Sequence, residues 1–214
     1  MKAILFDLDD TLVSRQIAFE KFCEYLIDKY LPSLPAPRTE IIAHMIAADG
    51  RGYRGADRFF NEIIDRWGFK TNPEQMMEER FAVFPEFTTP MPGMHEVLES
   101  LAARYPLGMI TNGSSNLQQS KIDRAGIRHY FSTIIVSGEV GMRKPDSRIF
   151  WLCCQQMGLD PSQTAYVGDN PLNDIEGSLS AGLRPYWLDR SDAPTPEHVI
   201  RLKQLTDLLP LFCK

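Results

Sequence analysis

The chain has 214 residues, of which 43% are hydrophobic and 24% are charged, and its formal net charge is −5. These values are ordinary for a globular protein of one or two domains. The negative net charge argues against a general nucleic-acid-binding surface, which needs clustered Lys and Arg. No apolar run approaches the length of a membrane span, and the N-terminus becomes acidic too soon for a signal peptide, so we expect a cytoplasmic protein without a membrane partner.

An apolar run at residues 3–6 leads directly into three carboxylates within four residues: Asp7, Asp9 and Asp10. The run predicts a short strand that is buried on both faces, as in a parallel sheet. Ligands of such sheets bind beyond the carboxyl ends of the strands. Clustered carboxylates repel one another unless a cation or a shared proton relieves them, which favours a metal site. The alternative is a plain polar turn, because Asp is common in turns.

Residues 14–87 show helical periodicity without a strand pattern. Large apolar residues recur at steps of three or four from Phe19 to Tyr30, which predicts one amphipathic helix. Thr39 is the expected N-cap of the second helix, and Pro73 lies near the first turn of the fourth. The second, third and fourth helices are expected at residues 39–48, 58–67 and 73–84.

From residue 90 onward the pattern changes to strands that alternate with helices, which predicts a parallel sheet. The expected strands are 107–111, 133–136, 164–167 and 185–188, and the expected helices are 94–105, 117–125, 147–157, 172–181 and 197–209. With residues 3–6 this gives an α/β fold with a five-stranded parallel Rossmann-like sheet and helices on both faces. We expect a core domain of residues 1–13 and 88–214 and a helical-bundle domain of residues 14–87.

Polar residues follow several of these strands. Thr111 and Asn112 come at the end of the second strand, Asp169 and Asp174 follow the fourth, and Lys144 lies beyond the third, directly before a proline. In a parallel sheet the strand-end residues share one edge. Each of these features also has a simpler explanation when it is taken singly. Thr111 and Asn112 fit a plain turn with a helix cap, Asp169 fits a helix N-cap, and Lys144 fits a solvated surface lysine.

Together these residues suit phosphoryl transfer. Asp7 and Asp169 can hold Mg²⁺, a hard cation that prefers oxygen ligands and neutralises an approaching phosphate. A nearby carboxylate can attack phosphorus, and another acid can protonate the leaving group and then activate water. Thr111, the backbone N–H groups near Asn112, and Lys144 can bind the equatorial oxygens of the phosphoryl group.

At these residues the sequence resembles the haloacid dehalogenase superfamily of phosphatases. The resemblance spans residues 3–188 and includes four motifs in order. They are D-L-D-D-T at residues 7–11, I-T-N-G with Thr111, G-M-R-K-P-D with Lys144, and G-D-N-P-L-N-D with Asp169 and Asp174.

The resemblance implies that Asp7 is the nucleophile and a Mg²⁺ ligand. It implies that Asp9 is the general acid and base and gives its backbone carbonyl to Mg²⁺, whereas Asp10 occupies a variable position. It further implies that residues 14–87 form a cap that closes over the site and selects the substrate.

For the other motifs the resemblance implies that Thr111 and Lys144 bind the phosphoryl group, and the chemistry above adds Asn112 as a phosphate-binding residue. Asp169 is then a direct Mg²⁺ ligand, and Asp174 acts through water or as a partner of the ligands.

Several functions compete on this fold. The dehalogenases of the superfamily lack the second aspartate of the first motif, so Asp9 argues against them. Phosphomutases and other phosphotransferases share Asp9 and stay open as alternatives to a phosphatase. A non-catalytic binding protein is expected to have lost Asp7, Asp9, Lys144 or Asp169, and all four are present.

The expected substrate is a small phosphorylated metabolite, and the motifs are most similar to those of the nucleotidase-like branch. A loop at residues 49–55 contains three glycines together with Arg51, Tyr53 and Arg54. We predict that residues 50–55 of this loop face the active site and that Arg51, Tyr53 or Arg54 touches the leaving group of the substrate; the alternative is an ordinary exposed basic turn. The sequence makes no prediction of the oligomeric state.

Overall fold

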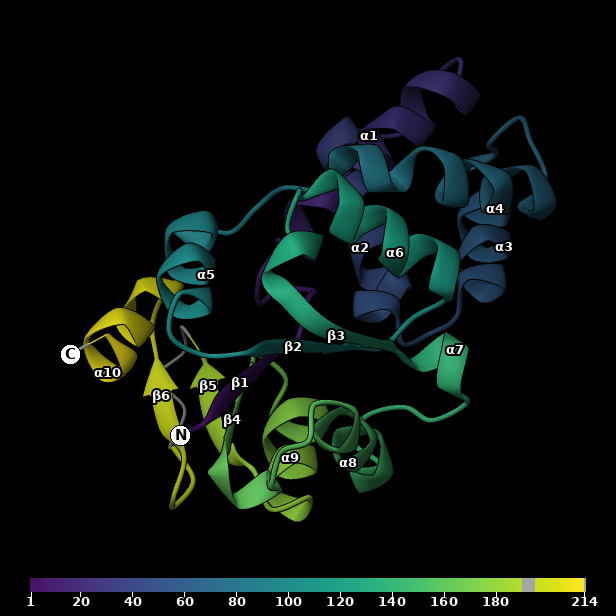
Figure 1. Cartoon of the computed structure of the whole chain (residues 1–214). Helices are drawn as coiled ribbons and strands as arrows, with labels where there is room; N and C mark the ends of the chain where they lie inside the picture. Colours follow the sequence, from purple (N-terminus) through teal and green to yellow (C-terminus); the bar gives the residue numbers. More distant parts are fainter. Residues whose placement is uncertain (190–194, 214) are drawn as a thin grey trace. The chain divides into compact units, whose positions relative to one another are not determined.

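The computed structural model describes residues 1–189 and 195–213 (Figure 1). The backbone divides into two compact units. The core unit consists of Met1–Ser14 and Pro90–Lys214, and the helical unit consists of Arg15–Thr89. In the order of the chain, the helical unit is an insertion that follows the first strand of the core unit.

A parallel sheet forms the centre of the core unit. Its strand order is β3-β2-β1-β4-β5-β6. The strands are β1 (Ala3–Phe6), β2 (Leu107–Thr111), β3 (Phe131–Val136), β4 (Thr164–Gly168), β5 (Arg184–Leu188) and β6 (Ile200–Leu202). The order reverses between β1 and β4, and at such a switch point the carboxyl ends of the two strands border a ligand-binding crevice.

Within the described residues this sheet has six strands, so the prediction of five was wrong. The expected helix at residues 197–209 was also wrong. That segment contains β6 and two short helical turns, η6 (Leu205–Leu208) and α10 (Leu209–Phe212). Ile200 and Leu202 pack into the apolar core, whereas Arg201 between them lies over the ring of Trp187 on β5, 5.1 Å from its centre. This alternation fits a strand, and pairing with the edge of β5 outweighs the helical preference of the segment.

Helices cover both faces of the sheet, as predicted (Figure 1). They are α5 (Met94–Ala102), α6 (Ser115–Arg124), α7 (Ser137–Val140), α8 (Ser147–Gln156), the π-helix η5 (Pro171–Glu176) and α9 (Gly177–Ser180). Ile4 and Phe6 pack with α5 in one apolar cluster, and Leu5 packs with α8 in another. The alternating side chains of β1 are therefore buried on opposite faces, which explains its uninterrupted apolar sequence.

The helical unit packs around aromatic side chains. Its elements are α1 (Arg15–Tyr30), α2 (Arg38–Asp49), η1 (Gly50–Gly52), α3 (Ala56–Trp67), α4 (Pro73–Ala82) and η2 (Phe84–Phe87). The rings of Phe22 and Phe84 lie 5.4 Å apart, and those of Phe19 and Phe59 lie 5.5 Å apart. Such aromatic pairs stabilise a fold by more than the burial of their apolar area alone would.

Two predicted helix starts had different outcomes. Helix α2 begins at Arg38 after Pro37, without a side-chain cap, so the predicted N-cap at Thr39 was wrong. Helix α4 begins as predicted with Pro73, and Asn72 caps it by accepting a hydrogen bond from the Gln75 backbone N–H at 2.8 Å.

Among the described residues, no helix combines the length and the apolar character that spanning a membrane would require.

Candidate active site

Three carboxylates converge where β1 and β4 end. Asp7 directly follows β1, and its backbone N–H donates to the carbonyl of Val167 at 2.9 Å, which continues the pairing of the two strands. Asp169 directly follows β4, and Asp174 lies in the π-helix η5. One oxygen from each of the three carboxylates lies within 4.8 Å of the other two. This spacing is short enough for them to share one cation or proton.

Lys144 lies among these carboxylates, and its side chain is only 2% exposed. Its ammonium donates to Asp7 Oδ1 and to Asp174 Oδ1, each at 2.6 Å, and to the hydroxyl of Tyr166 at 2.8 Å. The alternative of a solvated surface lysine was therefore wrong. The three N–H groups of the ammonium have one acceptor each, which fixes the side chain in place.

The charges of this cluster shift its ionisation. Burial raises the pKa of Asp7 well above its usual range, and the neighbouring carboxylates of Asp174 and Asp169 add to the rise, although Lys144 opposes it. Burial alone would lower the pKa of Lys144, but its contacts with Asp174 and Asp7 outweigh burial and raise it. Three carboxylates facing one ammonium leave an excess of negative charge, which a bound cation would relieve.

Asn112 holds the segment that carries Lys144. Its side-chain amide donates to the backbone carbonyl of Lys144 at 3.0 Å and accepts from the backbone N–H of Lys144 at 2.9 Å. Its side chain is thus occupied by the backbone of another loop. These contacts use the amide oxygen and one of the two amide N–H groups, so the second N–H and the backbone N–H are the donors that Asn112 has for a phosphoryl group.

Asp174 is bonded through both of its oxygens. Oδ1 accepts from Lys144 and from the hydroxyl of Tyr166 at 3.2 Å, and Oδ2 accepts from the backbone N–H of Asn170 at 2.9 Å. A Cβ atom on Gly168 would lie 2.5 Å from Asp174, so this close approach requires glycine. Asn170, rather than Asp169, caps η5, because its side chain accepts from the N–H groups of Leu172 and Asn173.

Asp9 lies against helix α6. Its carboxylate accepts from the ammonium of Lys121 at 2.8 and 2.9 Å and from the side-chain amide of Gln118 at 2.9 Å. The amide of Gln118 also donates to the hydroxyl of Thr111. Asp9 is therefore connected through Gln118 to Thr111 at the end of β2.

Our reading of the sequence missed Gln118, Lys121 and Tyr166. Gln118 and Lys121 are buried three residues apart on the same side of α6, between the buried apolar residues Leu117 and Ile122. Two polar residues within the apolar stripe of a helix that follows a predicted ligand-binding loop were the available signal. Tyr166 carried a weaker signal, a hydroxyl in the middle of a largely apolar strand.

The predicted substrate residues lie in the helical unit. Arg51 and Tyr53 are exposed, and Arg51 has a left-handed backbone conformation with a φ of 56°. Arg54 donates to the carboxylate of Glu62 at 2.9 Å. Whether the three residues face the substrate stays a prediction.

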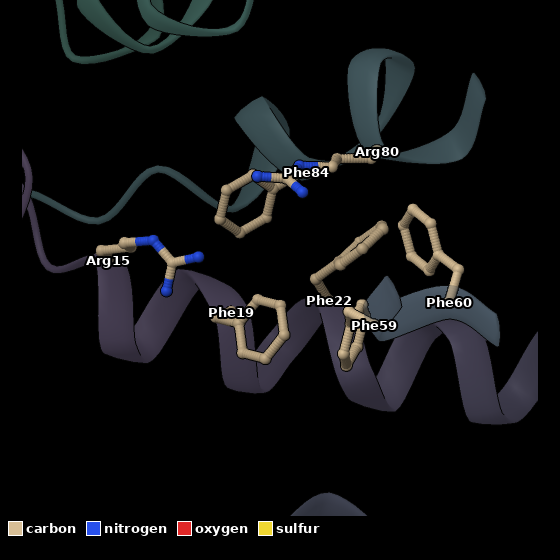
Figure 2. A pocket seen from close by; sticks show the side chains of 7 residues that line it. All are labelled: Arg15, Phe19, Phe22, Phe59, Phe60, Arg80 and Phe84. Carbon is tan, nitrogen blue, oxygen red and sulfur yellow. The ribbon is translucent and has the colours of Figure 1, made fainter. Parts of the chain in front are cut away.

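A crevice in the helical unit lies between two arginines and a group of phenylalanine rings (Figure 2). Its lining consists of Arg15, Phe19, Phe22, Phe59, Phe60, Arg80 and Phe84. The space between these side chains is about 210 Å³ and is partly open to solvent. This space has no room for a water-sized sphere, and the phenylalanines are almost fully buried, so the crevice belongs to the packed interior of the unit.

This chain is similar to known proteins over most of its length. A model of the haloacid dehalogenase-like hydrolase family matches residues 4–187. Pyrimidine 5'-nucleotidase YjjG of Escherichia coli is 35% identical over 71% of this chain and 70% of its own length. Phosphoserine phosphatase of Thermus thermophilus is 31% identical over 99% of this chain and 98% of its own length.

Solved structures share the fold. The candidate HAD-hydrolase YfnB of Bacillus subtilis superimposes with a TM-score of 0.83 at 20% identity, over 99% of this chain and 98% of YfnB. A candidate β-phosphoglucomutase of Thermotoga maritima superimposes with a TM-score of 0.79 at 19% identity, over 99% and 98% of the two chains. With the family match over most of its length and two relatives above 30% identity, this chain belongs to the haloacid dehalogenase-like hydrolase family.

Proposed function

We propose that this protein is a Mg²⁺-dependent phosphatase that hydrolyses small phosphate monoesters through an aspartyl-phosphate formed on Asp7. The observation that carries the proposal is the buried contact of Lys144 with Asp7 and Asp174, next to Asp169, at the ligand-binding edge of the sheet. The relatives named for nucleotides and for phosphoserine support a small phosphorylated substrate.

The acidic cluster fits Mg²⁺. Its donors are carboxylate oxygens, which this hard cation prefers, and they carry an excess of negative charge in a buried place. Asp7, Asp169 and the backbone carbonyl of Asp9 would hold the ion directly, whereas Asp174, whose oxygens already accept hydrogen bonds, would act through water. Bound Mg²⁺ would neutralise the charge of the phosphoryl group. The YfnB structure contains magnesium, which supports this choice.

In the first step, a carboxylate oxygen of Asp7 attacks phosphorus, and the bond between phosphorus and the leaving-group oxygen breaks. Asp9 gives its proton to that oxygen, so the leaving group departs as an alcohol. The products of this step are the alcohol and the aspartyl-phosphate of Asp7.

In the second step, water attacks the phosphorus of the aspartyl-phosphate. Asp9, now a carboxylate, takes a proton from that water, and the bond between phosphorus and the Asp7 oxygen breaks. Inorganic phosphate is released, and both aspartates return to their starting states.

The phosphoryl oxygens would be held by Thr111, the backbone N–H of Asn112 and Lys144. Because each N–H of Lys144 already has an acceptor, contact with a phosphoryl oxygen would replace one of its present partners. Lys144 would thus bind the phosphoryl group of the substrate and also pair with the negative charge of Asp7.

Residues 14–87 would act as the cap that selects the substrate, with Arg51, Tyr53 and Arg54 as contacts for the leaving group. The resemblance to nucleotidase sequences and the similarity to YjjG favour a nucleoside monophosphate as the first substrate to test. A phosphomutase would instead return an isomeric phosphate ester and release little inorganic phosphate.

The decisive experiment measures inorganic phosphate released from a panel of metabolite monoesters, with Mg²⁺ and with EDTA. We expect the wild type to release phosphate with Mg²⁺ but not with EDTA, and we expect Asp7→Asn to release none. The matched control is Asp10→Asn, which removes a neighbouring carboxylate and is tolerated by the left-handed backbone at Asp10, whose φ is 59°. Retained activity in Asp7→Asn would mean that the nucleophile is another residue.

A further inference from the structure

We propose that Gln118 and Lys121 are positioning residues for the reaction: Lys121 orients the acid Asp9, and Gln118 orients the hydroxyl of Thr111 toward the phosphoryl group. The inference rests on the proposed phosphatase function and adds two residues to its machinery. All four side chains belong to the core unit.

The contact between Lys121 and Asp9 is buried and involves both oxygens of the carboxylate. The ammonium lies 2.8 Å from Oδ1 and 2.9 Å from Oδ2, and the Lys121 side chain is 6% exposed. A lysine is rarely so buried unless it is paired, and here its partner is the aspartate two residues after Asp7. Contact with both oxygens limits rotation of the carboxylate about its Cβ–Cγ bond.

Gln118 links Asp9 to Thr111. Its side-chain nitrogen lies 2.9 Å from Asp9 Oδ2 and also contacts Thr111 Oγ1. In the carboxylate form that Asp9 has before the second step both oxygens only accept hydrogen bonds, so the atom of Gln118 that faces Asp9 is assigned as the amide nitrogen. The two N–H groups of this nitrogen therefore serve Asp9 and Thr111.

This arrangement sets the direction of the Thr111 hydroxyl. A hydroxyl has one proton to donate, and at Thr111 the oxygen already accepts from Gln118. The proton of Thr111 is consequently free to point to another acceptor. In the proposed reaction that acceptor is an oxygen of the phosphoryl group.

The fold makes room for this link at Gly113. A Cβ atom there would lie 2.7 Å from Cγ of Gln118, so a side chain at residue 113 would displace the amide. Gln118 is itself only 1% exposed, and burying an amide is unfavourable unless it is hydrogen-bonded. The glycine after Asn112 thus allows a helix residue to reach the end of β2.

The two residues should have separable effects on catalysis. An alkyl phosphate needs an acid to protonate its leaving oxygen, whereas 2,4-dinitrophenyl phosphate loses a stable anion without protonation. The value of kcat/KM reports the steps up to the first irreversible one. Here that step is the departure of the leaving group, which precedes attack by water. Loss of a group that orients Asp9 therefore lowers kcat/KM for the alkyl ester more than for the aryl ester.

We would compare Lys121→Met, Gln118→Met and the control Arg124→Met, which changes an exposed cation on the same helix. The substrates are 2,4-dinitrophenyl phosphate and either phosphoserine or uridine monophosphate, whichever the wild type hydrolyses faster. For Lys121→Met we expect kcat/KM to fall at least about tenfold with the alkyl ester and less than about threefold with the aryl ester, within the range of acid catalysis. Asp9→Asn should show the same selectivity.

For Gln118→Met we expect losses with both esters and at least about fivefold weaker inhibition by inorganic phosphate, because Thr111 contacts the group that both esters share. Equal losses with the two esters in Lys121→Met, or none, would overturn the role of Lys121. Unchanged phosphate inhibition in Gln118→Met would overturn the role of Gln118. Thermal unfolding of each variant shows whether it is folded.

A crystal structure of Lys121→Met gives a readout that does not depend on activity. We expect the Asp9 carboxylate to rotate away from its wild-type orientation; an unchanged orientation would count against positioning by Lys121. If the wild type hydrolyses neither these esters nor any monoester of the metabolite panel, the proposed function fails, while the crystal structure still tests whether Lys121 orients Asp9.

Discussion

The ammonium of Lys144 lies 2.6 Å from Asp7 Oδ1, and the two side chains are only 2% and 9% exposed. The same ammonium contacts Asp174 at 2.6 Å, so it pairs with two carboxylates from different parts of the chain. Removing the ammonium is strongly unfavourable because it leaves two buried carboxylates without their cation, whereas without Asp7 the ammonium would still pair with Asp174.

Replacing Lys144 by methionine is expected to reduce both activity and stability. The variant Lys144→Met leaves Asp7 and Asp174 without their cation, which should cost about 3–5 kcal/mol in the free energy of unfolding in EDTA. We expect kcat/KM to fall at least about 100-fold, as for the removal of one charge-stabilising donor. Phosphate-release assays and urea denaturation measure the two effects.

The matched control is Lys70→Met, which removes an exposed lysine of the helical unit. If Lys144→Met retained wild-type kcat/KM, Lys144 would have no part in the proposed reaction.

Asn112→Ala is expected to displace Lys144 without touching its side chain. The substitution removes both hydrogen bonds to the Lys144 backbone, each worth about 1 kcal/mol in net stability. We expect kcat/KM to fall about tenfold, because misplacing a group near the reacting atoms is costly. The control Asn116→Ala changes an exposed asparagine of α6. Equal activity of the two variants would show that the Lys144 loop holds its position without Asn112.

Asp7→Asn is expected to stabilise the protein in EDTA at neutral pH. The folded state raises the pKa of Asp7, chiefly by burial, above that of an unfolded aspartate. Between the two pKa values the folded state binds a proton that the unfolded state has released, so stability falls as pH rises through this window and stays lower above it. Asparagine does not titrate and removes this loss.

We would measure unfolding of wild type and Asp7→Asn from pH 4 to 8 in EDTA, with Asp10→Asn as a control. Each kcal/mol corresponds to about 2–4 °C in Tm for a chain of this size. Excess Mg²⁺ should stabilise the wild type more than Asp7→Asn, because a ligand stabilises the state that binds it. A lower Tm for Asp7→Asn in EDTA throughout this range would contradict the destabilising role of the buried carboxylate.

Arg51→Ala and Arg54→Ala test the predicted contacts with the substrate. We expect Arg51→Ala to raise KM about tenfold with little change in kcat, as for loss of uniform binding. Arg54 already donates to Glu62, so we expect a smaller effect there. The control is Arg58→Ala, at another exposed position of the unit. Unchanged kcat/KM in both Arg51→Ala and Arg54→Ala would leave the loop as an ordinary basic turn.

Several elements followed from local patterns alone. The strands at residues 3–6 and 107–111 lie where their apolar runs predicted them, because a strand buried on both faces needs apolar residues without interruption. The parallel order then placed Asp7 and Asp169 at one edge of the sheet, and the structure brings them within 4.8 Å of each other and of Asp174. For these features the short-range sequence carries nearly all the information.

The sequence by itself thus determined the alternating α/β organisation and the family resemblance, whereas the tertiary structure decided the last strand and the partners of each charge. Strand β6 exists because the edge of β5 offers backbone hydrogen bonds, which no local pattern encodes. Lys121 and Asp9 are 112 residues apart, and Lys144 and Asp7 are 137 apart. Whether a polar side chain is solvated or buried against an opposite charge depends on which distant segments pack beside it, so only the folded chain shows how Gln118 and Lys121 contact the acid of the proposed reaction.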